Sequence, residues 1–248
     1  MTARTEKSIV IIPTYNEAVG IIPVVDEVLS LPRNLHVLVV DDASPDGTAG
    51  LIEAHPAFQT RLHLIKRMGK FGLGTAYREG FNWALQQNYT TLIQMDADHS
   101  HNPQDIPRLL EEIDQGTDLA LGSRYINGVR VLNWPMRRLF MSTFAGFYTR
   151  VLTGLPFADP TSGFKAIYHE SLRRLPWTSF TSNGYSFQEE LHFYLWHTGA
   201  SCKEIPIIFT ERREGQSKLS WQTAPEAAWR VLTLAFEKLW RGYQRSVS

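Results

Sequence analysis

Apolar and polar positions follow two regular patterns in the first half of the chain. Short uninterrupted runs rich in Val, Ile and Leu predict buried strands at residues 8–12, 36–40, 62–66, 92–98 and 118–122. Apolar positions at helical spacing between these runs predict helices at residues 17–31, 73–87 and 103–115, and the turn at 46–48 leads into a shorter one. Strands that alternate with helices in this way predict an α/β fold with a largely parallel sheet and helices on both faces.

The alternation stops after residue 124, where longer amphipathic segments begin. Residues 134–153 predict a helix with Pro135 in its first turn and a stripe formed by Phe140, Phe144, Phe147 and Val151. A second such helix spans residues 221–243, and its apolar face consists of Ala228, Val231, Leu232, Ala235, Phe236, Leu239 and Tyr243. Each helix suits either packing against the sheet or lying in a membrane interface.

Two shorter elements complete the second half of the chain. A helix is predicted near residues 186–197, and a strand is predicted over 203–209, where Pro206 favours an edge position. No internal repeat or low-complexity segment divides the 248 residues, which suffice for one large domain. We therefore expect a single domain made of residues 1–124, 125–220 and 221–248.

Composition narrows the possible classes of function. Twenty-five basic residues balance twenty-five acidic ones, so no overall positive field favours nucleic acid. Cys202 is the single cysteine, which excludes an internal disulfide and fits a reducing compartment. The first seven residues lack the apolar stretch of a signal peptide. Arg230, Glu237 and Lys238 interrupt the best candidate for a membrane span, so we expect no integral segment.

Two acidic residues, Asp96 and Asp98, end the fourth predicted strand. Open α/β sheets bind ligands at the carboxyl edge of their strands, which is where these carboxylates are expected. Carboxylate oxygens suit Mg²⁺ or Mn²⁺ held jointly with substrate phosphates, with Ser100 at most an auxiliary ligand. The neighbouring His99 and His101 would suit a softer metal, although His101 equally fits a turn. The alternative for the whole stretch is a solvated acidic turn.

The first two predicted strands deliver further groups to the same edge. Tyr15 and Glu17 follow the first strand, and Asp42 ends the second. An aromatic ring and two carboxylates can hold a purine and a ribose, because carboxylates accept hydrogen bonds from ring N–H groups and sugar hydroxyls. Glu17 by itself equally fits the first turn of a helix, where the helix dipole favours an acidic side chain.

The glycine-rich stretch at residues 69–75 does not match the known phosphate-binding loops. It lacks the Walker spacing of Lys and Ser or Thr, and Tyr77 stands where the dinucleotide fingerprint needs its third glycine. We therefore expect these glycines to form a tight turn, with Gly74 and Thr75 at the start of a helix near the donor sugar.

Four cations are the candidates for binding phosphate in a chain without net charge. They are Arg124, Arg138, Arg212 and Lys218. The forked guanidinium of Arg matches phosphate oxygens, whereas Lys supplies a mobile point charge. Residues 212–218 form a basic loop with Gly and Ser that could close over a diphosphate and exclude water. The alternative for each cation is ordinary solvation at the surface.

These residues together resemble the polyprenol (dolichol) phosphate mannose synthases, inverting glycosyltransferases of family 2 with the GT-A fold. The resemblance extends over nearly the whole chain. It rests on the motifs PTYNE (13–17), VDDASPDGT (40–48), GLGTAY (72–77), QMDAD (94–98), GSRY (122–125), DPTSGFK (159–165), GYSFQEEL (184–191) and GQSKLS (215–220).

The resemblance implies three groups of site residues. Contacts to the nucleotide sugar would come from Pro13, Tyr15, Glu17, Val40, Asp42, Asp96, Ala97, Asp98, Arg212 and Lys218. The divalent metal would be held by Asp96, Asp98 and Ser100. The acceptor phosphate would be held by Arg124, Arg138 and Ser142. Catalysis would depend on Asp98, Arg124 and Arg138.

The implied reaction transfers mannose from GDP-mannose to a polyprenyl or dolichyl monophosphate, with inversion to a β-linked product. Residues 1–124 would form the nucleotide-sugar half, residues 125–220 the acceptor half with the basic loop, and residues 221–248 a C-terminal amphipathic helix. The resemblance also implies a peripheral enzyme on the cytosolic face of a membrane, or a subunit held there by a small anchoring partner. Two alternatives are a polyprenyl-phosphate transferase for glucose or another hexose, and a catalytically silent nucleotide-binding membrane scaffold.

Overall fold

The computed structural model describes residues 4–210, 224–240 and 242. Their strands are β1 (Ser8–Thr14), β2 (Leu35–Asp41), β3 (Leu62–Lys66), β4 (Thr91–Gln94), β5 (Leu119–Ser123), β6 (Val131–Leu132), β7 (Lys165–Tyr168), β8 (Cys202–Pro206) and β9 (Phe209–Thr210). Their α-helices are α1 (Ile21–Ser30), α2 (Thr48–Glu53), α3 (Leu73–Gln86), α4 (Ile106–Asp114), α5 (Met136–Thr153), α6 (His169–Arg173), α7 (Phe187–His197) and α8 (Ala224–Trp240). Two short 3-10 turns occupy Pro103–Asp105 and Trp177–Ser179.

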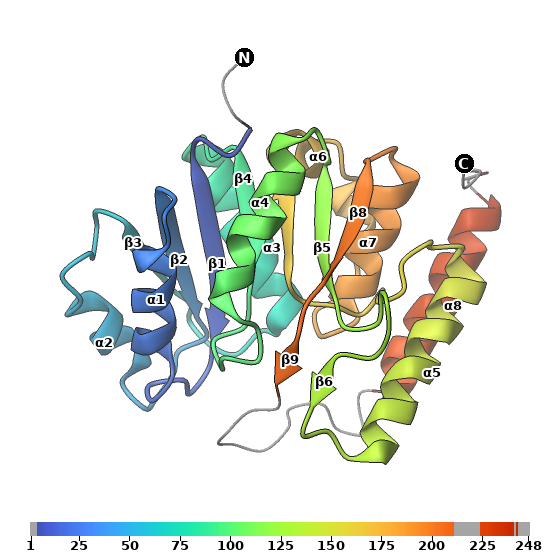
Figure 1. Cartoon of the computed structure of the whole chain (residues 1–248), viewed down its shortest axis with the longest axis horizontal. Coiled ribbons are helices and arrows are strands. Elements are labelled where there is room, and N and C mark those ends of the chain that lie inside the picture. Colours follow the sequence, from blue (N-terminus) through green and yellow to red (C-terminus); the bar gives the residue numbers. More distant parts are fainter. Residues whose placement is uncertain (1–3, 211–223, 241, 243–248) are drawn as a thin grey trace.

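Seven strands form one sheet in the order β3-β2-β1-β4-β7-β5-β8 (Figure 1). All neighbours are parallel except β7, which runs antiparallel between β4 and β5. The predicted α/β class is therefore confirmed, and so is the edge position of the Pro206 strand. The antiparallel insertion of β7 was not predicted. Strand order reverses between β1 and β4, which is the kind of switch point where open α/β sheets bind ligands.

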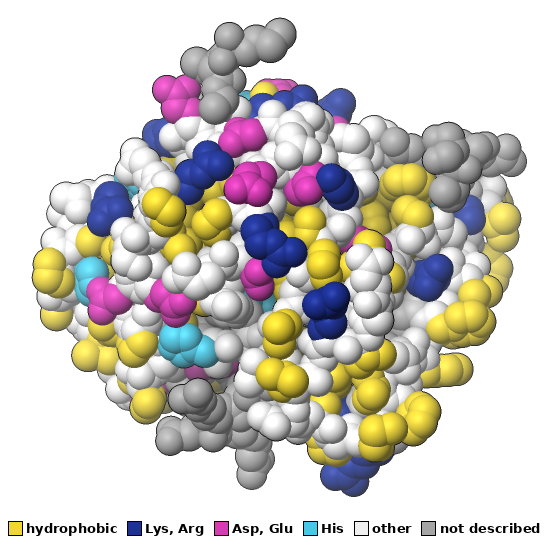
Figure 2. Space-filling model, in the orientation of Figure 1, with side chains coloured by type: hydrophobic (Ala, Val, Ile, Leu, Met, Phe, Trp, Pro, Cys, Tyr) yellow, Lys and Arg dark blue, Asp and Glu magenta, His cyan; other side chains and the backbone are white. Residues whose placement is uncertain are grey.

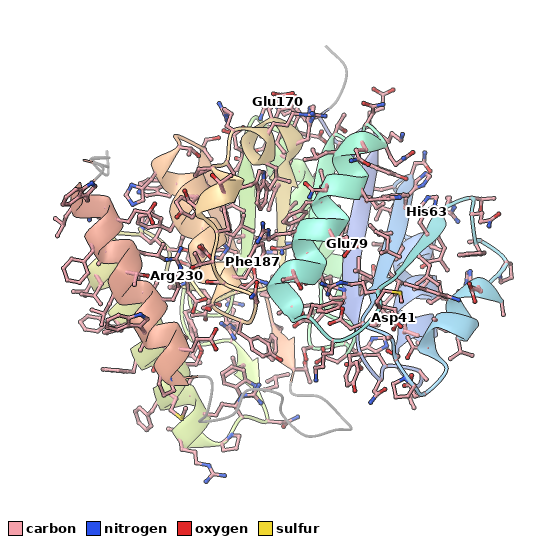
Figure 3. All side chains as sticks on the ribbon, turned by 180° about the vertical axis from the view of Figure 1, so that it is seen from behind. Asp41, His63, Glu79, Glu170, Phe187 and Arg230 are labelled. Atoms are coloured by element: carbon pink, nitrogen blue, oxygen red, sulfur yellow. The ribbon has the colours of Figure 1, made fainter. Side chains whose placement is uncertain are left out.

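Helices cover both faces of the sheet, as the sequence predicts. On one face the buried side chains of β1, β2 and β4 pack against α1 and α4. On the other face they pack against α3 and α7, with α8 at the rim (Figure 3). The core strands are Val-, Ile- and Leu-rich because a parallel sheet covered on both faces buries nearly every side chain.

Helices α5 and α8 lie side by side at one end of the molecule (Figure 1). Each carries a stripe of large apolar side chains that are more than half exposed. The α5 stripe is Met136, Phe140, Phe144, Phe147 and Val151, and the α8 stripe is Trp229, Phe236, Leu239 and Trp240. Figure 2 shows hydrophobic side chains gathered along the rim formed by α5. Among the described residues, no helix combines the length and apolarity needed to cross a bilayer.

The structure corrects three element predictions. The predicted apolar face of residues 221–243 is divided, because Val231 is buried whereas Phe236 and Leu239 are exposed. The predicted strand over 203–209 consists of β8 and the separate β9, which pairs with β6. The helix predicted from residue 17 begins at Ile21, so Glu17 precedes the helix and does not lie in its first turn. Residues 221–223 and Tyr243 lie outside the described residues.

Candidate active site

The ends of β1 and β2 are joined by buried polar contacts at the ligand edge. The Thr14 hydroxyl donates to Asp41 at 2.8 Å, and the Asp42 backbone N–H donates to the Thr14 carbonyl at 3.0 Å. Pro13 pairs with Val40 in the parallel register. The Val40 side chain is fully buried in the core, so any contact with a ligand would involve its main chain. The predicted nucleotide residues of these two strands therefore do meet at one edge.

Arg67 is a buried residue of this edge that the sequence analysis missed. It follows β3 and forms an ion pair with Asp42. Its Nη2 donates to the Thr75 hydroxyl at 2.6 Å, and its Nε lies 3.1 Å from a carboxylate oxygen of Glu79. Its place immediately after a strand is the signal that could have identified it. The guanidinium fixes the Asp42 carboxylate at this edge of the sheet.

Two residues of the glycine-rich stretch lie over neighbouring side chains of this edge. The Lys70 ammonium is 4.1 Å from the ring centroid of Tyr15, and the Phe71 ring lies 5.1 Å from the Arg67 guanidinium carbon. Gly72 precedes α3 with a φ of 99°, and a Cβ there would lie 2.4 Å from the Asn183 carbonyl oxygen. The structural role predicted for residues 69–75 is therefore confirmed by the close approach that only glycine permits.

The metal candidates lie just beyond β4, next to the switch point. Asp98 Oδ1 accepts the Ser100 backbone N–H at 3.0 Å, and the Asp96 backbone N–H donates to His101 Nδ1 at 3.3 Å. The Asp96 side chain is 33% exposed. Ala97 is buried against the core. The two carboxylates thus project from a turn that is held by main-chain hydrogen bonds.

His101 supports this turn from behind. It is buried, with its ring stacked on Phe164 at 5.0 Å. Burial lowers the pKa of His101 and outweighs the nearby charges of Asp96 and Asp98, which act to raise it. A neutral imidazole fits the role of Nδ1 as acceptor of the Asp96 N–H. The neighbouring His99 is exposed with a φ of 56°, which is a turn conformation.

The donor set fits a hard divalent ion better than a soft one. Asp96 and Asp98 offer carboxylate oxygens two residues apart, and Ser100 lies buried beside them. Within the described ranges, no three or more His, Cys, Asp or Glu side chains gather into a cage for a metal. Two carboxylates, with the other positions filled by water and phosphate, are the usual protein share of a Mg²⁺ site.

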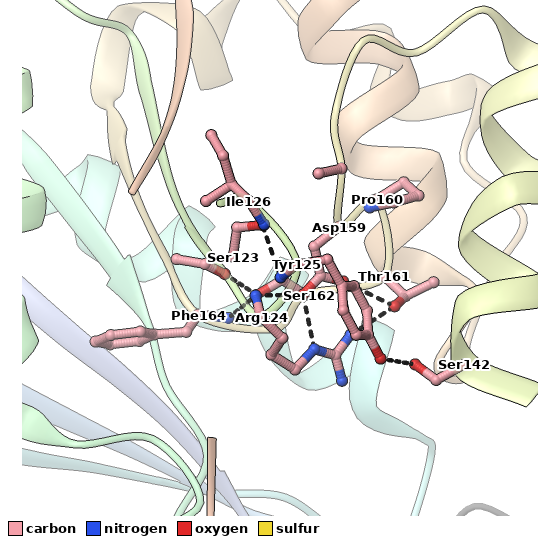
Figure 4. Close-up of polar contacts among 12 residues, drawn as sticks. Ser123, Arg124, Tyr125, Ile126, Ser142, Asp159, Pro160, Thr161, Ser162 and Phe164 are labelled. Carbon is pink, nitrogen blue, oxygen red and sulfur yellow. Dashed lines mark hydrogen bonds and ion pairs between the residues drawn. The ribbon is translucent and has the colours of Figure 1, made fainter. Parts of the chain in front are cut away.

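Arg124, at the end of β5, is held by a buried carboxylate that the sequence analysis missed. Its Nε and Nη2 donate to the two oxygens of Asp159 at 2.7 and 2.6 Å, and its backbone N–H donates at 3.0 Å (Figure 4). Nη2 also donates to the Thr161 hydroxyl at 2.7 Å. Within the part of the chain that the structure describes, Nη1 of Arg124 donates no hydrogen bond. The Arg124 guanidinium, which is predicted to bind a phosphate, is thus already partly occupied by Asp159.

The charges of this pair are mutually stabilised. Burial by itself would raise the pKa of Asp159, but the charge and hydrogen bonds of Arg124 outweigh it and hold the pKa below its ordinary value. Asp159 is also fixed through its own backbone N–H, which donates to Glu204 at 3.0 Å. A fully buried carboxylate with a bidentate arginine gives Arg124 one well-defined orientation.

The three predicted acceptor residues are brought to one place. Ser142, on α5, accepts the Tyr125 hydroxyl at 2.6 Å, and Tyr125 follows Arg124 in the chain (Figure 4). The guanidinium carbons of Arg138 and Arg124 lie 4.1 and 5.6 Å from the ring centroid of Trp134. Their binding of a phosphate stays a prediction. Arg212 and Lys218 lie outside the described residues.

A buried polar layer lies next to the metal candidates. Lys165, fully buried on β7, donates to the Gln188 side chain. Burial lowers the pKa of Lys165 well below its usual value and raises the pKa of Glu189 to about 7. A Cβ on Gly163 would lie 3.8 Å from both Asp96 Oδ1 and Gln188 Nε2, so this layer adjoins Asp96. Sequence reasoning did not identify these residues as a site, because Lys165 begins a strand of only four residues that has no clear apolar pattern.

The sheet order, the switch point and the carboxylate pair beyond β4 are what a nucleotide-sugar enzyme of the α/β class needs, and the comparisons define that class. The protein is a glycosyltransferase with the GT-A fold. Solved structures agree in fold: a complex of glucosyl-3-phosphoglycerate synthase from Mycobacterium tuberculosis with Mn²⁺, uridine diphosphate and phosphoglyceric acid aligns with a TM-score of 0.67. That likeness covers 94% of this chain and 78% of the other, at 16% identity.

Within this class, the chain belongs to the glycosyl transferase family 2, whose sequence profile matches residues 9–175. It is 44% identical over 228 residues to a polyprenol monophosphomannose synthase of Mycolicibacterium smegmatis, covering 92% of this chain and 86% of that protein. It is 38% identical over 232 residues to an undecaprenyl-phosphate mannosyltransferase of Micrococcus luteus, covering 94% and 95% respectively.

Proposed function

We propose that this glycosyltransferase transfers mannose from GDP-mannose to a polyprenyl (dolichyl) monophosphate and inverts the anomeric centre. The two relatives named above act, by their names, on polyprenyl phosphates and transfer mannose, which supports the acceptor and the sugar. The observation that carries the proposal is one site with two ends. Asp96 and Asp98 form an acidic end suited to a nucleotide diphosphate with its metal, and Arg124 and Arg138 form a basic end suited to a second phosphate.

The acceptor supplies its own nucleophile in this reaction. The second pKa of a phosphate monoester is about 6, so its oxygen is largely anionic near neutral pH and needs no side-chain base. The oxygen attacks the anomeric carbon as the bond to the nucleotide diphosphate breaks. The protein therefore has to hold two anions close together and in line.

Each group of residues has one task in this scheme. Asp42, positioned by Arg67, and Tyr15 bind the nucleoside. Asp96 and Asp98, with Ser100 at most auxiliary, hold Mg²⁺ or Mn²⁺, and when bound there the ion supplies charge neutralisation for the departing diphosphate. Further contacts to the donor come from Pro13, Glu17, Val40, Ala97, Arg212 and Lys218. Arg124, Arg138 and Ser142 bind the acceptor phosphate by charge and hydrogen bonds.

The exposed apolar stripes of α5 and α8 suit the lipid part of the acceptor. Arg138 and Ser142 belong to the same helix as Phe140 and Phe144, so the phosphate site adjoins a surface of aromatic side chains. Contiguous exposed apolar surface commonly marks a membrane or partner contact. Amphipathic helices of this kind lie in the interfacial plane of a bilayer. We infer a peripheral enzyme on the cytosolic face of a membrane.

A direct assay tests the proposal. The full chain is incubated with radiolabelled GDP-mannose or UDP-glucose and with polyprenyl monophosphates of several lengths, with Mg²⁺, Mn²⁺ or a chelator. We expect labelled lipid only from GDP-mannose, no product with the chelator, and a β-anomeric linkage by NMR. Product from UDP-glucose instead would favour the hexose alternative. No product from any pair would favour a silent nucleotide-binding scaffold.

A further inference from the structure

A small two-stranded sheet connects the acidic end of the site to its basic end. β6 and β9 are parallel partners, and the Phe209 N–H donates to the Arg130 carbonyl at 3.0 Å. On one side, the Thr210 N–H donates to the Ser100 carbonyl at 3.3 Å. On the other, the Arg130 N–H donates to the Arg124 carbonyl at 2.8 Å. The backbone of this β6–β9 ribbon is therefore bonded to both the metal turn and the acceptor arginine.

Aromatic rings follow the same path between the two ends. The Arg138 guanidinium carbon lies 4.1 Å from the ring centroid of Trp134. The Trp134 ring meets Phe209 edge-on at 5.5 Å, and Phe209 meets His101 edge-on at 5.3 Å. His101 in turn accepts the Asp96 N–H at 3.3 Å. This aromatic row, defined as Trp134, Phe209 and His101, connects an acceptor cation to the backbone of the metal candidate Asp96.

Arg124 lies beside the row. Its guanidinium carbon is 5.6 Å from the Trp134 centroid and 5.5 Å from the Phe209 centroid. Two guanidiniums that converge on one phosphate repel each other before it binds. The negative face of an aromatic ring attracts cations and can offset that repulsion. Trp134 Nε1 is buried and has no hydrogen-bond partner among the described residues, so this side chain contacts them through its ring.

We propose that Trp134, supported by Phe209, is a positioning residue that fixes the separation between the acceptor arginines and the metal-end carboxylates. The inference rests on the proposed function, because it assigns a distance that matters only if two substrates react across the site. Misplacement of one reactant by about 1 Å can cost on the order of 10²-fold in rate. The row consists of rigid rings in edge and face contact, which resist compression better than flexible side chains would.

Two substitutions of Trp134 separate its ring face from its bulk. Trp134→Phe keeps an aromatic face, whereas Trp134→Leu keeps apolar bulk and loses that face. We expect Trp134→Phe to stay within about threefold of the wild type, and Trp134→Leu to raise the KM for polyprenyl monophosphate about tenfold and to lower kcat. The binding constant for GDP-mannose, measured by calorimetry with Mn²⁺, should not change in either variant.

A misaligned acceptor also leaves room for water to attack in its place. Attack of water on the anomeric carbon breaks the same bond to the diphosphate and releases free mannose and GDP. We therefore expect Trp134→Leu to raise the ratio of free mannose to mannolipid severalfold. Phe209→Leu should change both readouts in the same direction by a smaller factor, because the Phe209 ring lies against Arg124 alone whereas the Trp134 ring lies against both arginines.

Trp83→Leu is the matched control. Trp83 is a half-buried tryptophan on α3 that packs on His63 at 5.0 Å, away from the site. The Trp83→Leu substitution should lower the melting temperature of the protein without changing the KM for polyprenyl monophosphate or the ratio of free mannose to mannolipid. Unchanged kinetics in Trp134→Leu, equal losses in Trp134→Phe and Trp134→Leu, or weakened donor binding would each overturn the positioning role. If the wild-type chain itself makes no mannolipid, the proposed function fails instead, which the same assay shows before any variant is compared.

Discussion

Two regions of the molecule are built in opposite ways. One is the sheet edge that carries Tyr15, Asp42, Asp96 and Asp98, called here the nucleotide edge, and the other is the pair of helices α5 and α8. At the nucleotide edge, polar side chains are paired with buried partners, as Thr14 is with Asp41 and Arg67 with Asp42. The α5–α8 pair instead exposes large apolar side chains, with Phe140 at 67% and Phe236 at 69% exposure. The first region is preorganised for a polar, charged ligand, and the second offers a surface for an apolar one. The contrast suits an enzyme whose proposed substrates differ in the same way.

Buried ion pairs attach α8 and the segment that follows α5 to the rest of the molecule. Arg124, the residue after β5, pairs with Asp159, which lies in the segment after α5. Arg230 of α8, labelled in Figure 3, pairs with Glu190 of α7. The Glu190 carboxylate also accepts the N–H groups of Thr181 and Ser182 at 2.9 Å. The exposed helices are thus attached to the core by charges as well as by apolar packing. Substitutions that remove one of these ion pairs, or that change one region alone, test the comparison.

The largest effect is expected from Asp159→Asn. Removing one partner of a buried pair leaves the Arg124 charge uncompensated, which typically costs about 3–5 kcal/mol. Urea unfolding of the full chain measures this loss. Asp26→Asn is the control, because its side chain is 63% exposed and its loss should cost little. An Asp159→Asn variant as stable as the wild type would mean that the Arg124–Asp159 ion pair does not contribute to the stability of the fold.

The same pair gives a pH dependence with a defined sign. Because the folded-state pKa of Asp159 is depressed below 3.8, its contribution to stability is present above that value and is lost as pH falls through the folded-state pKa. The wild type should therefore lose stability in acid faster than Asp159→Asn. Unfolding free energies measured from neutral pH down to about 3 test this difference. Parallel curves would contradict it.

The next largest effect is expected from Asp98→Ala. Loss of one preorganised charge contact at a reacting centre typically costs on the order of 10²- to 10³-fold in turnover. Co-sedimentation with lipid vesicles should not change, because Asp98 belongs to the nucleotide edge and not to the helix pair. Asp105→Ala, which removes an ion pair with Arg108 a few residues further along, is the control. Full metal-dependent activity in Asp98→Ala would refute the metal assignment.

The sequence predicted the nucleotide edge better than the rest of the molecule. Uninterrupted apolar runs predict buried parallel strands, and parallel strands place their following residues at one edge, so Tyr15, Asp42 and Asp96 were brought together correctly. The partner of Arg124 could not be predicted, because Asp159 is 35 residues away in an irregular segment. Antiparallel β7 was missed because it is only four residues long and begins with a charged residue, Lys165.

The faces of the helices were the least predictable. Helical spacing identifies an apolar stripe but does not tell whether the stripe meets the core or the outside. In α8 both occur, since Val231 and Leu234 are buried while Trp229 and Trp240 are exposed. Only the packing of α8 against α5 and α7 decides which residues remain outside.

A smaller effect is expected from Phe140→Ser combined with Phe144→Ser. Full burial of a Phe side chain away from water is favourable by about 1.5–3 kcal/mol of transfer free energy. Loss of two rings that insert only partly into the bilayer should therefore still weaken vesicle binding by about tenfold or more. Co-sedimentation with anionic vesicles measures the change, while activity on a short, water-soluble acceptor phosphate should persist. Leu51→Ser, on α2, is the control, because Leu51 is exposed outside the helix pair. Unchanged vesicle binding would remove α5 from the membrane contact.

The smallest effect is expected from Tyr194→Phe, which tests how firmly α8 is held. The Tyr194 hydroxyl on α7 donates to Glu237 of α8 at 2.9 Å, and burial together with that carboxylate raises the pKa of Tyr194, so the donor keeps its proton. Loss of this hydrogen bond should lower the free energy of unfolding by about 0.5–1.5 kcal/mol.

Hydrogen exchange resolved by segment distinguishes a local loosening of α8 from a general loss of stability. In Tyr194→Phe the amides of α8 should exchange faster while those of β1 and β4 do not. Tyr89→Phe, which removes a contact with His36 at 2.9 Å on β2, toward the opposite edge of the sheet, should leave α8 exchange unchanged. If both variants accelerate exchange everywhere alike, α8 unfolds only with the whole molecule. The apolar stripe would then be as firmly built as the nucleotide edge, and the two regions would differ in polarity but not in rigidity.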